Sequence, residues 1–461
     1  MCLNEKSMNK QSSKFPSQRP APGKRCFTSK AVEYAIDEIK ATIADKELRW
    51  LFENCFPNTL DTTVHYYEKK GRPFTYVITG DIDAMWLRDS TAQVWPYLPF
   101  APKDEKLKKL LKGVVNKQTE FVLLDPYANA FYDDPKKKSH WSGDLTEMKP
   151  GVHERKWELD SLCYVVRLAH GYWKNTGDVS IFDSSWRKAM KLIVKTLKEQ
   201  QRKDSNGPYK FERRTVNPTD TQCGRGYGNP TRKVGLIHSM FRPSDDGTIY
   251  PFLISSNMFA VVSLRQLNYI FSKLLGDERF ARECERLAKE IDQALKKYAI
   301  GSHCVAGKIY ALEVDGFGNN LFMDDANVPN LLSIPYLGYC RLGDPLYRNT
   351  RRFSLSRCNP WFNEGKFAKG IGGPHVGQKK IWPLGLVMQA LTSTDDREIL
   401  YCLKTLKNTH AGTGFIHESF HVDNPKDFSR KWFAWANTIF GELIVKLYEN
   451  KPNLLKKKLS K

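Results

Sequence analysis

Apolar residues recur at helical spacing through most of this chain. Between residues 31 and 44 they fall three and four positions apart, which places them on one face of a helix. The same spacing predicts longer helices at 48–56, 103–124, 157–175, 179–203, 255–275, 278–299, 382–394, 396–409 and 432–450. Shorter helices are expected at 90–95, 328–337 and 345–353. Strand-like patterns are few, and the main ones lie at 59–78 and 305–312.

Long loops rich in glycine, proline and aromatic residues separate some of the predicted helix pairs. They run over residues 125–150, 204–250, 365–380 and 412–425. Helix pairs in this order predict an all-α fold, one α/α barrel over residues 27–452 whose loops form a pocket at one end. Residues 1–26 are polar and are expected to be a disordered tail, and residues 453–461 a basic C-terminal tail.

The chain is strongly basic, with 72 Lys and Arg against 51 Asp and Glu, a formal net charge of +21. The densest basic runs, at 103–112, 136–138, 195–203 and 456–461, lie far apart. They lack interleaved glycine and aromatic residues and any zinc-finger spacing, so the charge favours a solvated surface over a nucleic-acid or polyanion partner.

The ten cysteines are scattered without a Cys-x-x-Cys pair, a pattern typical of free thiols in a reducing compartment. No apolar run reaches the length of a membrane span, so no membrane partner is expected. The N-terminus lacks the apolar segment of a signal peptide. The expected location is therefore cytoplasmic, with a periplasmic or secreted protein left open if the start is mis-assigned.

Residues 79–90 combine charge with large apolar side chains in an unusual way. Asp81, Asp83, Arg88 and Asp89 surround Trp86 in this stretch. The mixture suits a pocket that stacks against an apolar face and hydrogen-bonds several hydroxyl groups, as a sugar requires. The alternative is a buried Arg–Asp structural pair with Trp86 in the core, and this stretch alone leaves both open.

A second candidate is Asp245-Asp246, which follows Pro243 and precedes Gly247. An ordinary turn has the same composition. Arg242 next door favours function, because a carboxyl near a cation or another carboxylate can acquire a pKa suited to proton transfer. Asn257, just beyond, joins the candidate site.

A third candidate is the pattern His417-Glu418-x-x-His421. On a helix it would place two imidazoles on one face for zinc, with Glu418 as the base of a metallopeptidase. Two glycines just before and Asp-Asn-Pro just after leave little room for a helix. The other interpretations make Glu418 a catalytic loop carboxylate or an ordinary capping residue. Two carboxyls on different loops around an aromatic pocket are what glycoside hydrolysis needs.

Taken together, these motifs resemble glycoside hydrolase family 125, the metal-independent exo-α-1,6-mannosidases. The resemblance extends over nearly all of the chain after residue 26. It rests on six motifs in one order: GDIDAMWLRDS at 80–90, WELD at 157–160, FRPSDD at 241–246, SNM at 256–258, GGPH at 372–375 and GFIHESF at 414–420.

The resemblance implies an (α/α)6 barrel that removes terminal α-1,6-linked mannose with inversion and uses neither cofactor nor metal. It places the general acid on Asp245, with Asp246 as the fallback, and the general base on Glu418. Arg88 and Asp89 would hold mannose hydroxyls. The further substrate-binding residues expected are Asp83, Trp86, Asp246, Asn257, His375, Trp382, His417 and Trp432.

In an inverting enzyme the two catalytic carboxyls should lie roughly 6.5–9.5 Å apart, with room for a water. Asp245 would need a raised pKa, through burial and repulsion from Asp246. The expected partners are α-mannoside glycans, with no nucleic acid, and the oligomeric state is open. The alternatives are the zinc metallopeptidase, another (α/α)6 glycosidase acting on glucosides or trehalose, and a non-catalytic glycan-binding or polyanion-binding barrel.

Overall fold

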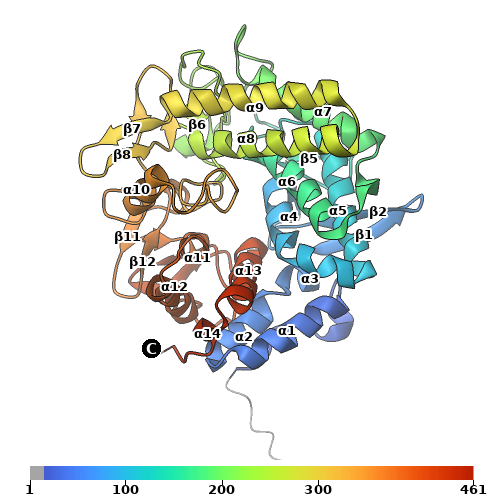
Figure 1. Cartoon of the computed structure of the whole chain (residues 1–461), viewed down its shortest axis with the longest axis vertical. Coiled ribbons are helices and arrows are strands. Elements are labelled where there is room, and N and C mark those ends of the chain that lie inside the picture. Colours follow the sequence, from blue (N-terminus) through green and yellow to red (C-terminus); the bar gives the residue numbers. More distant parts are fainter. Residues whose placement is uncertain (1–14, 460–461) are drawn as a thin grey trace, which may run out of the picture.

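Two layers of helices form the framework of the protein, arranged as a ring in Figure 1. The computed structural model describes residues 15–459. The inner layer contains helices that are buried along most of their length: α4 (Leu87–Val94), α6 (Leu159–Thr176), α8 (Ile254–Tyr269), α11 (Pro383–Leu391) and α13 (Ala434–Asn450). The outer layer contains α1 (Lys30–Thr42), α2 (Lys46–Cys55), α5 (Glu105–Leu124), α7 (Ser184–Glu199), α9 (Glu278–Tyr298), α10 (Pro345–Ser354) and α12 (Asp396–Asn408).

The packing order of the inner helices is that of an α/α barrel, which confirms the all-α fold class. Along the ring α11 packs on α13, α13 on α4, α4 on α6 and α6 on α8. The outer helices α2, α5, α9 and α12 pack against α13, α6, α8 and α11. Outer helices are amphipathic: α9 buries Phe280, Cys284, Leu287 and Ile291 at spacings of three and four. Inner helices bury nearly all of their faces because other helices surround them.

The helix predicted at 328–337 is wrong. The chain runs there in buried turns, at the place in the ring where a sixth inner helix would come. Prolines at 329 and 335 interrupt the pattern. The Asp324 carboxylate instead accepts from the backbone N–H groups of Leu331 and Leu332, at 2.9 and 3.1 Å.

Short elements complete the chain. They are α3 (Asn58–Thr62), α14 (Pro452–Leu455), a π-helical turn at Ile270–Leu274, and 3-10 turns at Pro22–Lys24, Trp95–Lys103, Val179–Ile181, Pro218–Asp220 and Pro374–Val376.

Six small antiparallel sheets join the loops. Three of them pair two strands each: β1 (Val64–Lys69) with β2 (Arg72–Val77), β7 (Ile300–His303) with β8 (Gly307–Tyr310), and β11 (Phe362–Glu364) with β12 (Lys369–Ile371). The others have three: β3 (Met85–Trp86), β4 (Ala130–Phe131) and β5 (Val152–Glu154); β6 (Phe252–Leu253), β9 (Glu313–Val314) and β10 (Asn320–Leu321); β13 (Lys380–Ile381), β14 (Ser419–His421) and β15 (Asn424–Ser429). Each three-stranded sheet contains a strand that leads into an inner helix, so the sheets fix the loops at the N-terminal ends of those helices.

The predicted tails are wrong over the residues that the structure describes. Residues 1–14 and 460–461 lie outside that range. Arg19, with its side chain 5% exposed, donates to both oxygens of Asp61 and to Glu33, at 2.5–3.1 Å. At the other end Leu454 and Leu455 are buried, and Lys407 donates to the carbonyl of residue 459 at 2.6 Å. These segments are ordered because they cover apolar surface and pair buried charges. Within residues 15–459, no helix is both long enough and apolar enough to cross a membrane.

Candidate functional site

A cavity of about 450 Å³ lies where the N-terminal ends of the inner helices meet. It is lined by residues from α4 and α13, from strands β3 and β5, and from the long loops between helices. Seven of the predicted site residues line it: Trp86, Arg88, Asp89, Asp245, His375, Trp382 and Glu418.

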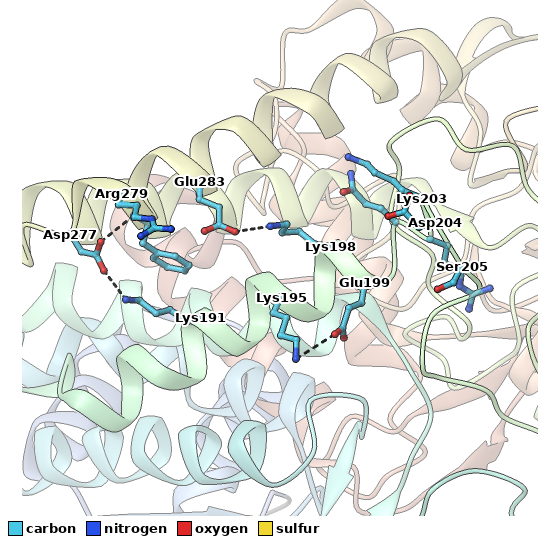
Figure 2. Close-up of a pocket in the computed structure, with 13 residues that line it drawn as sticks. Lys191, Lys195, Lys198, Glu199, Lys203, Asp204, Ser205, Asp277, Arg279 and Glu283 are labelled. Atoms are coloured by element: carbon cyan, nitrogen blue, oxygen red, sulfur yellow. Dashed lines mark hydrogen bonds and ion pairs between the residues drawn. The ribbon is translucent and has the colours of Figure 1, made fainter.

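A larger cavity, of about 740 Å³, lies between α7 and α9 and is lined mainly by charged side chains (Figure 2). Lys191 pairs with Asp277 at 2.8 Å and Lys198 with Glu283 at 2.9 Å. Its cations therefore mostly neutralise neighbouring acids, and no predicted site residue lines it. The smaller cavity is the candidate active site.

Arg88, in the first turn of α4, is the centre of a cluster of carboxyl groups. Its guanidinium lies 2.5 Å from Glu158, 3.2 Å from Asp160, 3.4 Å from Asp245 and 3.6 Å from Asp89. One cation cannot neutralise four carboxylates, three of them buried, so this cluster favours retention of a proton. Burial raises the pKa of Asp89 to about 6, although Arg88 opposes the shift.

Glu158 and Asp245 share that proton. Glu158 has no exposed surface, and burial raises its pKa well above the usual value although Arg88 opposes the shift. Burial would raise the pKa of Asp245 too, but Arg88, a hydrogen bond from Glu158 and Lys156 outweigh it and hold that pKa below its usual range. The expected rise in the pKa of Asp245 is therefore wrong, and burial favours the protonated form of Glu158 instead.

Asp245 is the member of the pair that faces the cavity, with 29% of its side chain exposed. The loop holds it in a left-handed conformation, with φ of 68°, which costs free energy for a residue other than glycine. The backbone N–H of Asp245 donates to the carbonyl of Arg242 at 2.9 Å and so closes a turn. The side chain of Arg242 is fixed in turn by an ion pair with buried Glu313 at 2.6 Å. Strain of this kind is typical of functional sites.

Asp246 points the other way and does not line the cavity. It is 2% exposed and accepts from Thr219 and Ser244, at 3.0 and 3.2 Å. It lies 3.3 Å from His375. Partial burial lowers the pKa of His375, but Asp246 outweighs this and raises it to about 9. Asp246 thus keeps a cationic imidazole at the rim of the cavity.

Glu418 approaches the cavity from the loop that leads into β14. It accepts from Ser429 at 2.8 Å and lies 3.4 Å from Arg430. Arg430 in turn pairs with Asp81 at 2.5 Å and donates to Thr79 at 3.1 Å. A carboxylate held by a hydroxyl and a guanidinium, and 7% exposed, is oriented to accept a proton from a water in the cavity.

Aromatic side chains form much of the remaining wall. Trp86, Trp382, Phe433 and Trp435 line the cavity, and each is at most 7% exposed. Trp86 is held edge-on by His153, with ring centroids 5.1 Å apart. Such rings offer apolar faces to a pyranose beside the carboxylates that bind its hydroxyls.

Besides Asp246, four predicted site residues lie outside the cavity. Asp83 is exposed and pairs with Lys137 at 3.4 Å. Asn257 is fully buried and bonds the backbone N–H and carbonyl of Ile237, a structural role. His417 stacks on Phe428, with centroids 3.7 Å apart.

Trp432 contributes its backbone, not its ring. Its carbonyl accepts from the N–H of Asp81 at 3.2 Å. A Cβ atom at Gly80, whose φ is +130°, would lie 2.3 Å from the same oxygen, so only glycine allows this contact. The ring of Trp432 lines a separate cavity beside Arg19.

The zinc-metallopeptidase alternative is not supported, because no helix forms over residues 417–421. The chain runs there into β14, so the two imidazoles do not share a helical face. His417 hydrogen-bonds Thr413 at 3.0 Å, and Nδ1 of His421 accepts from the N–H of Asp423 at 3.1 Å. No group of three or more His, Cys, Asp or Glu side chains with metal-binding geometry occurs within residues 15–459.

Sequence reasoning gave no role to Glu158, Asp160 or Arg430. The sequence does contain a signal for Glu158 and Asp160, because these two acidic residues stand at the start of a helical pattern that is otherwise apolar. Arg430 lies in a polar loop with no distinguishing pattern. Its link to Glu418 and Asp81 exists only in the fold.

Comparison with known proteins identifies the family of the chain. A model of the family of metal-independent α-mannosidases, GH125, matches residues 45–445. The meiotically up-regulated gene 157 protein of Schizosaccharomyces pombe is 44% identical over 467 residues, which cover 97% of this chain and 91% of that protein.

Two solved structures are similar as well. A metal-independent α-mannosidase of Streptococcus pneumoniae, in a non-productive complex with α-1,6-mannobiose, superimposes with a TM-score of 0.89 and 43% identity, over 92% of this chain and 100% of that one. A bacterial glucoamylase in complex with acarbose shares the fold, with a TM-score of 0.54 and 12% identity over 82% of this chain and 51% of that one.

Proposed function

The chain belongs to family GH125, the metal-independent α-mannosidases, and from that membership we propose that it removes terminal α-1,6-linked mannose with inversion at the anomeric carbon. The linkage is supported by the similarity to the pneumococcal enzyme, whose complex contains α-1,6-mannobiose. A cavity of about 450 Å³ that is partly lined by aromatic side chains suits one sugar at a chain end better than the middle of a polymer.

The observation that supports the mechanism best is the placement of two differently held carboxyls around one cavity. Asp245 is hydrogen-bonded to a proton-bearing Glu158, whereas Glu418 accepts hydrogen bonds from Ser429 and Arg430. When two carboxyls have such different hydrogen-bond partners, one is suited to donate a proton and the other to accept one.

In the proposed reaction the proton of Glu158 passes to Asp245 as Asp245 protonates the glycosidic oxygen and the carbon–oxygen bond breaks. The Glu158–Asp245 pair therefore loses one proton as a whole. Glu418 takes a proton from the water that attacks the opposite face of the sugar and forms the new carbon–oxygen bond. Transfer of a proton from Glu418 through solvent to the Glu158–Asp245 pair restores the starting state.

Arg88 and Asp89 would bind the mannose hydroxyls, because both line the cavity and are rigidly held. Trp86, Trp382 and Trp435 would cover the apolar faces of the ring. His375 would add positive charge at the rim.

The test is release of mannose from α-1,6-mannobiose by metal-stripped protein in excess EDTA, with NMR identifying the anomer that forms first. Prompt β-mannose is the expected result. Release of α-mannose would overturn inversion, and hydrolysis of an α-glucoside in place of the mannoside would indicate a different (α/α)6 glycosidase.

A further inference from the structure

The outer wall of the cavity contains an aromatic side chain that the proposed reaction has not used. Trp141 lines the cavity and is partly exposed. The guanidinium of Arg213 covers one face of the indole, 3.6 Å from the ring centroid. The His140 ring lies 4.5 Å away, also centroid to centroid. The indole is therefore packed against two neighbouring side chains and is still partly exposed at the cavity, where a ligand can reach it.

The guanidinium of Arg213 is fixed by several hydrogen bonds, so it can hold the indole of Trp141 in place. Arg213 is 7% exposed and binds Asp144 through two nitrogens, at 2.9 and 2.7 Å. It also donates to Glu154 at 3.1 Å and to Asp220 at 3.0 and 3.1 Å. Several charge-assisted bonds to a planar guanidinium fix its plane, and that plane fixes the tilt of Trp141.

The backbone around Trp141 is also restrained. The Trp141 N–H donates to Ser139 at 3.0 Å, and its carbonyl accepts from the Asp144 N–H at 3.0 Å. Ser139 donates to the carbonyl of His153 at 2.5 Å. A pre-oriented ring loses little conformational entropy when a sugar stacks on it.

A chain of contacts links this wall to the proposed acid. Asp220 accepts from both Arg213 and Lys156, the latter at 2.6 Å. Lys156 then donates to the backbone carbonyl of Asp245 at 2.8 Å. Trp141 is thus connected through neighbouring residues to Asp245, whereas Glu418 is held separately by Ser429 and Arg430. In an inverting hydrolysis the leaving group departs on the side of the acid.

We propose that Trp141, backed by Arg213, is the stacking platform for the leaving sugar of the substrate, and so determines which leaving groups the enzyme accepts. This inference rests on the proposed function. An indole face stacks on the apolar face of a pyranose and contacts few of its hydroxyl groups. The acceptable leaving group is therefore any neutral sugar ring that can lie flat on Trp141, rather than mannose alone.

The test compares two substrates that differ only in the leaving group. The first is α-1,6-mannobiose, and the second is α-mannosyl fluoride, whose leaving atom cannot stack. Trp141→Ala is expected to lower kcat/KM for mannobiose by about tenfold or more and to leave the value for the fluoride unchanged. Trp141→Phe, which keeps a smaller ring, is expected to fall between.

The matched control is Trp173→Ala. Trp173 is partly exposed on α6, packs beside His170 and Tyr269, and does not line the cavity. It should leave both substrates unaffected. Equal losses on both substrates in Trp141→Ala, or no loss on mannobiose, would overturn the platform. If the wild-type protein hydrolyses neither substrate, the proposed function itself fails.

Discussion

Replacing Glu158 by glutamine tests where the catalytic proton is stored. Glutamine fills the same volume, offers an oxygen to Arg88, which donates to Glu158 at 2.5 Å, and keeps a donor for Asp245. It has no acidic proton to give. Because it also removes one carboxyl from a cluster that crowds a single guanidinium, we expect little loss of folding stability.

The expected loss of activity follows from the role of the proton. Positioned proton transfer contributes about 10²–10⁴-fold to rate, equivalent to about 3–5 kcal/mol of barrier. We expect kcat for α-1,6-mannobiose to fall within that range in Glu158→Gln. The loss on α-mannosyl fluoride should be far smaller, since fluoride departs without a proton.

The pH profile gives a second readout. Burial raises the pKa of Glu158 well above its usual value, so the Glu158–Asp245 pair loses its proton at a higher pH than an ordinary glutamate does. Wild-type kcat/KM on mannobiose should therefore fall on the alkaline side, and Glu158→Gln should lack that limb. Asp160→Asn is the matched control, because Asp160 is equally buried and bonds the same Arg88 nitrogen at 3.2 Å.

In Asp160→Asn any loss should be the same for both substrates. The reasoning would be refuted if Glu158→Gln hydrolysed mannobiose at the wild-type rate. It would also be refuted if mannobiose and fluoride hydrolysis fell equally in Glu158→Gln, because Glu158 would then serve only the structure.

Three further predictions concern the base, the rim and the N-terminal segment. Glu418→Gln should lower kcat about 10²–10⁴-fold on mannobiose and fluoride alike, since both reactions need an activated water; a loss confined to mannobiose would contradict the base role. Asp246 raises the pKa of His375 to about 9. The contribution of the His375–Asp246 ion pair to folding stability is therefore fully present below about pH 6.5 and is lost as the pH rises through 9. Calorimetry from pH 6 to 10 should show a flatter Tm in His375→Asn than in wild type, and parallel curves would argue against the pair. Arg19→Ala leaves buried Asp61 without its closest cation and should cost about 3 kcal/mol in urea unfolding; an unchanged midpoint would show that residues 15–26 add no stability.

The periodicity of the sequence was sufficient for most of the helices. Amphipathic runs such as α9 were predicted within one or two residues, because the spacing of apolar side chains is a local property. The prediction failed at 328–337, where prolines and side-chain bonds to the backbone replace a helix. The N-terminal segment was misjudged because its polar residues are ordered by partners such as Asp61, which lies 42 positions from Arg19.

The active site also combines features that the sequence predicts with features that only the fold decides. The sequence identified Arg88, Asp245 and Glu418, because charged residues beside Trp, Pro and Gly stand out in an otherwise amphipathic chain. It could not distinguish Asp89, which lines the cavity, from Asp83, which faces solvent. That choice depends on where α4 begins and which way its first turn points.

The pKa values were decided by tertiary structure alone. Asp246, the sequence neighbour expected to raise the pKa of Asp245, faces away from the cavity, while Arg88 and Glu158 arrive from 157 and 87 positions earlier in the sequence. Electrostatic interactions depend on distance in space and on exclusion of water. Both are set only when the N-terminal ends of the inner helices close around the cavity.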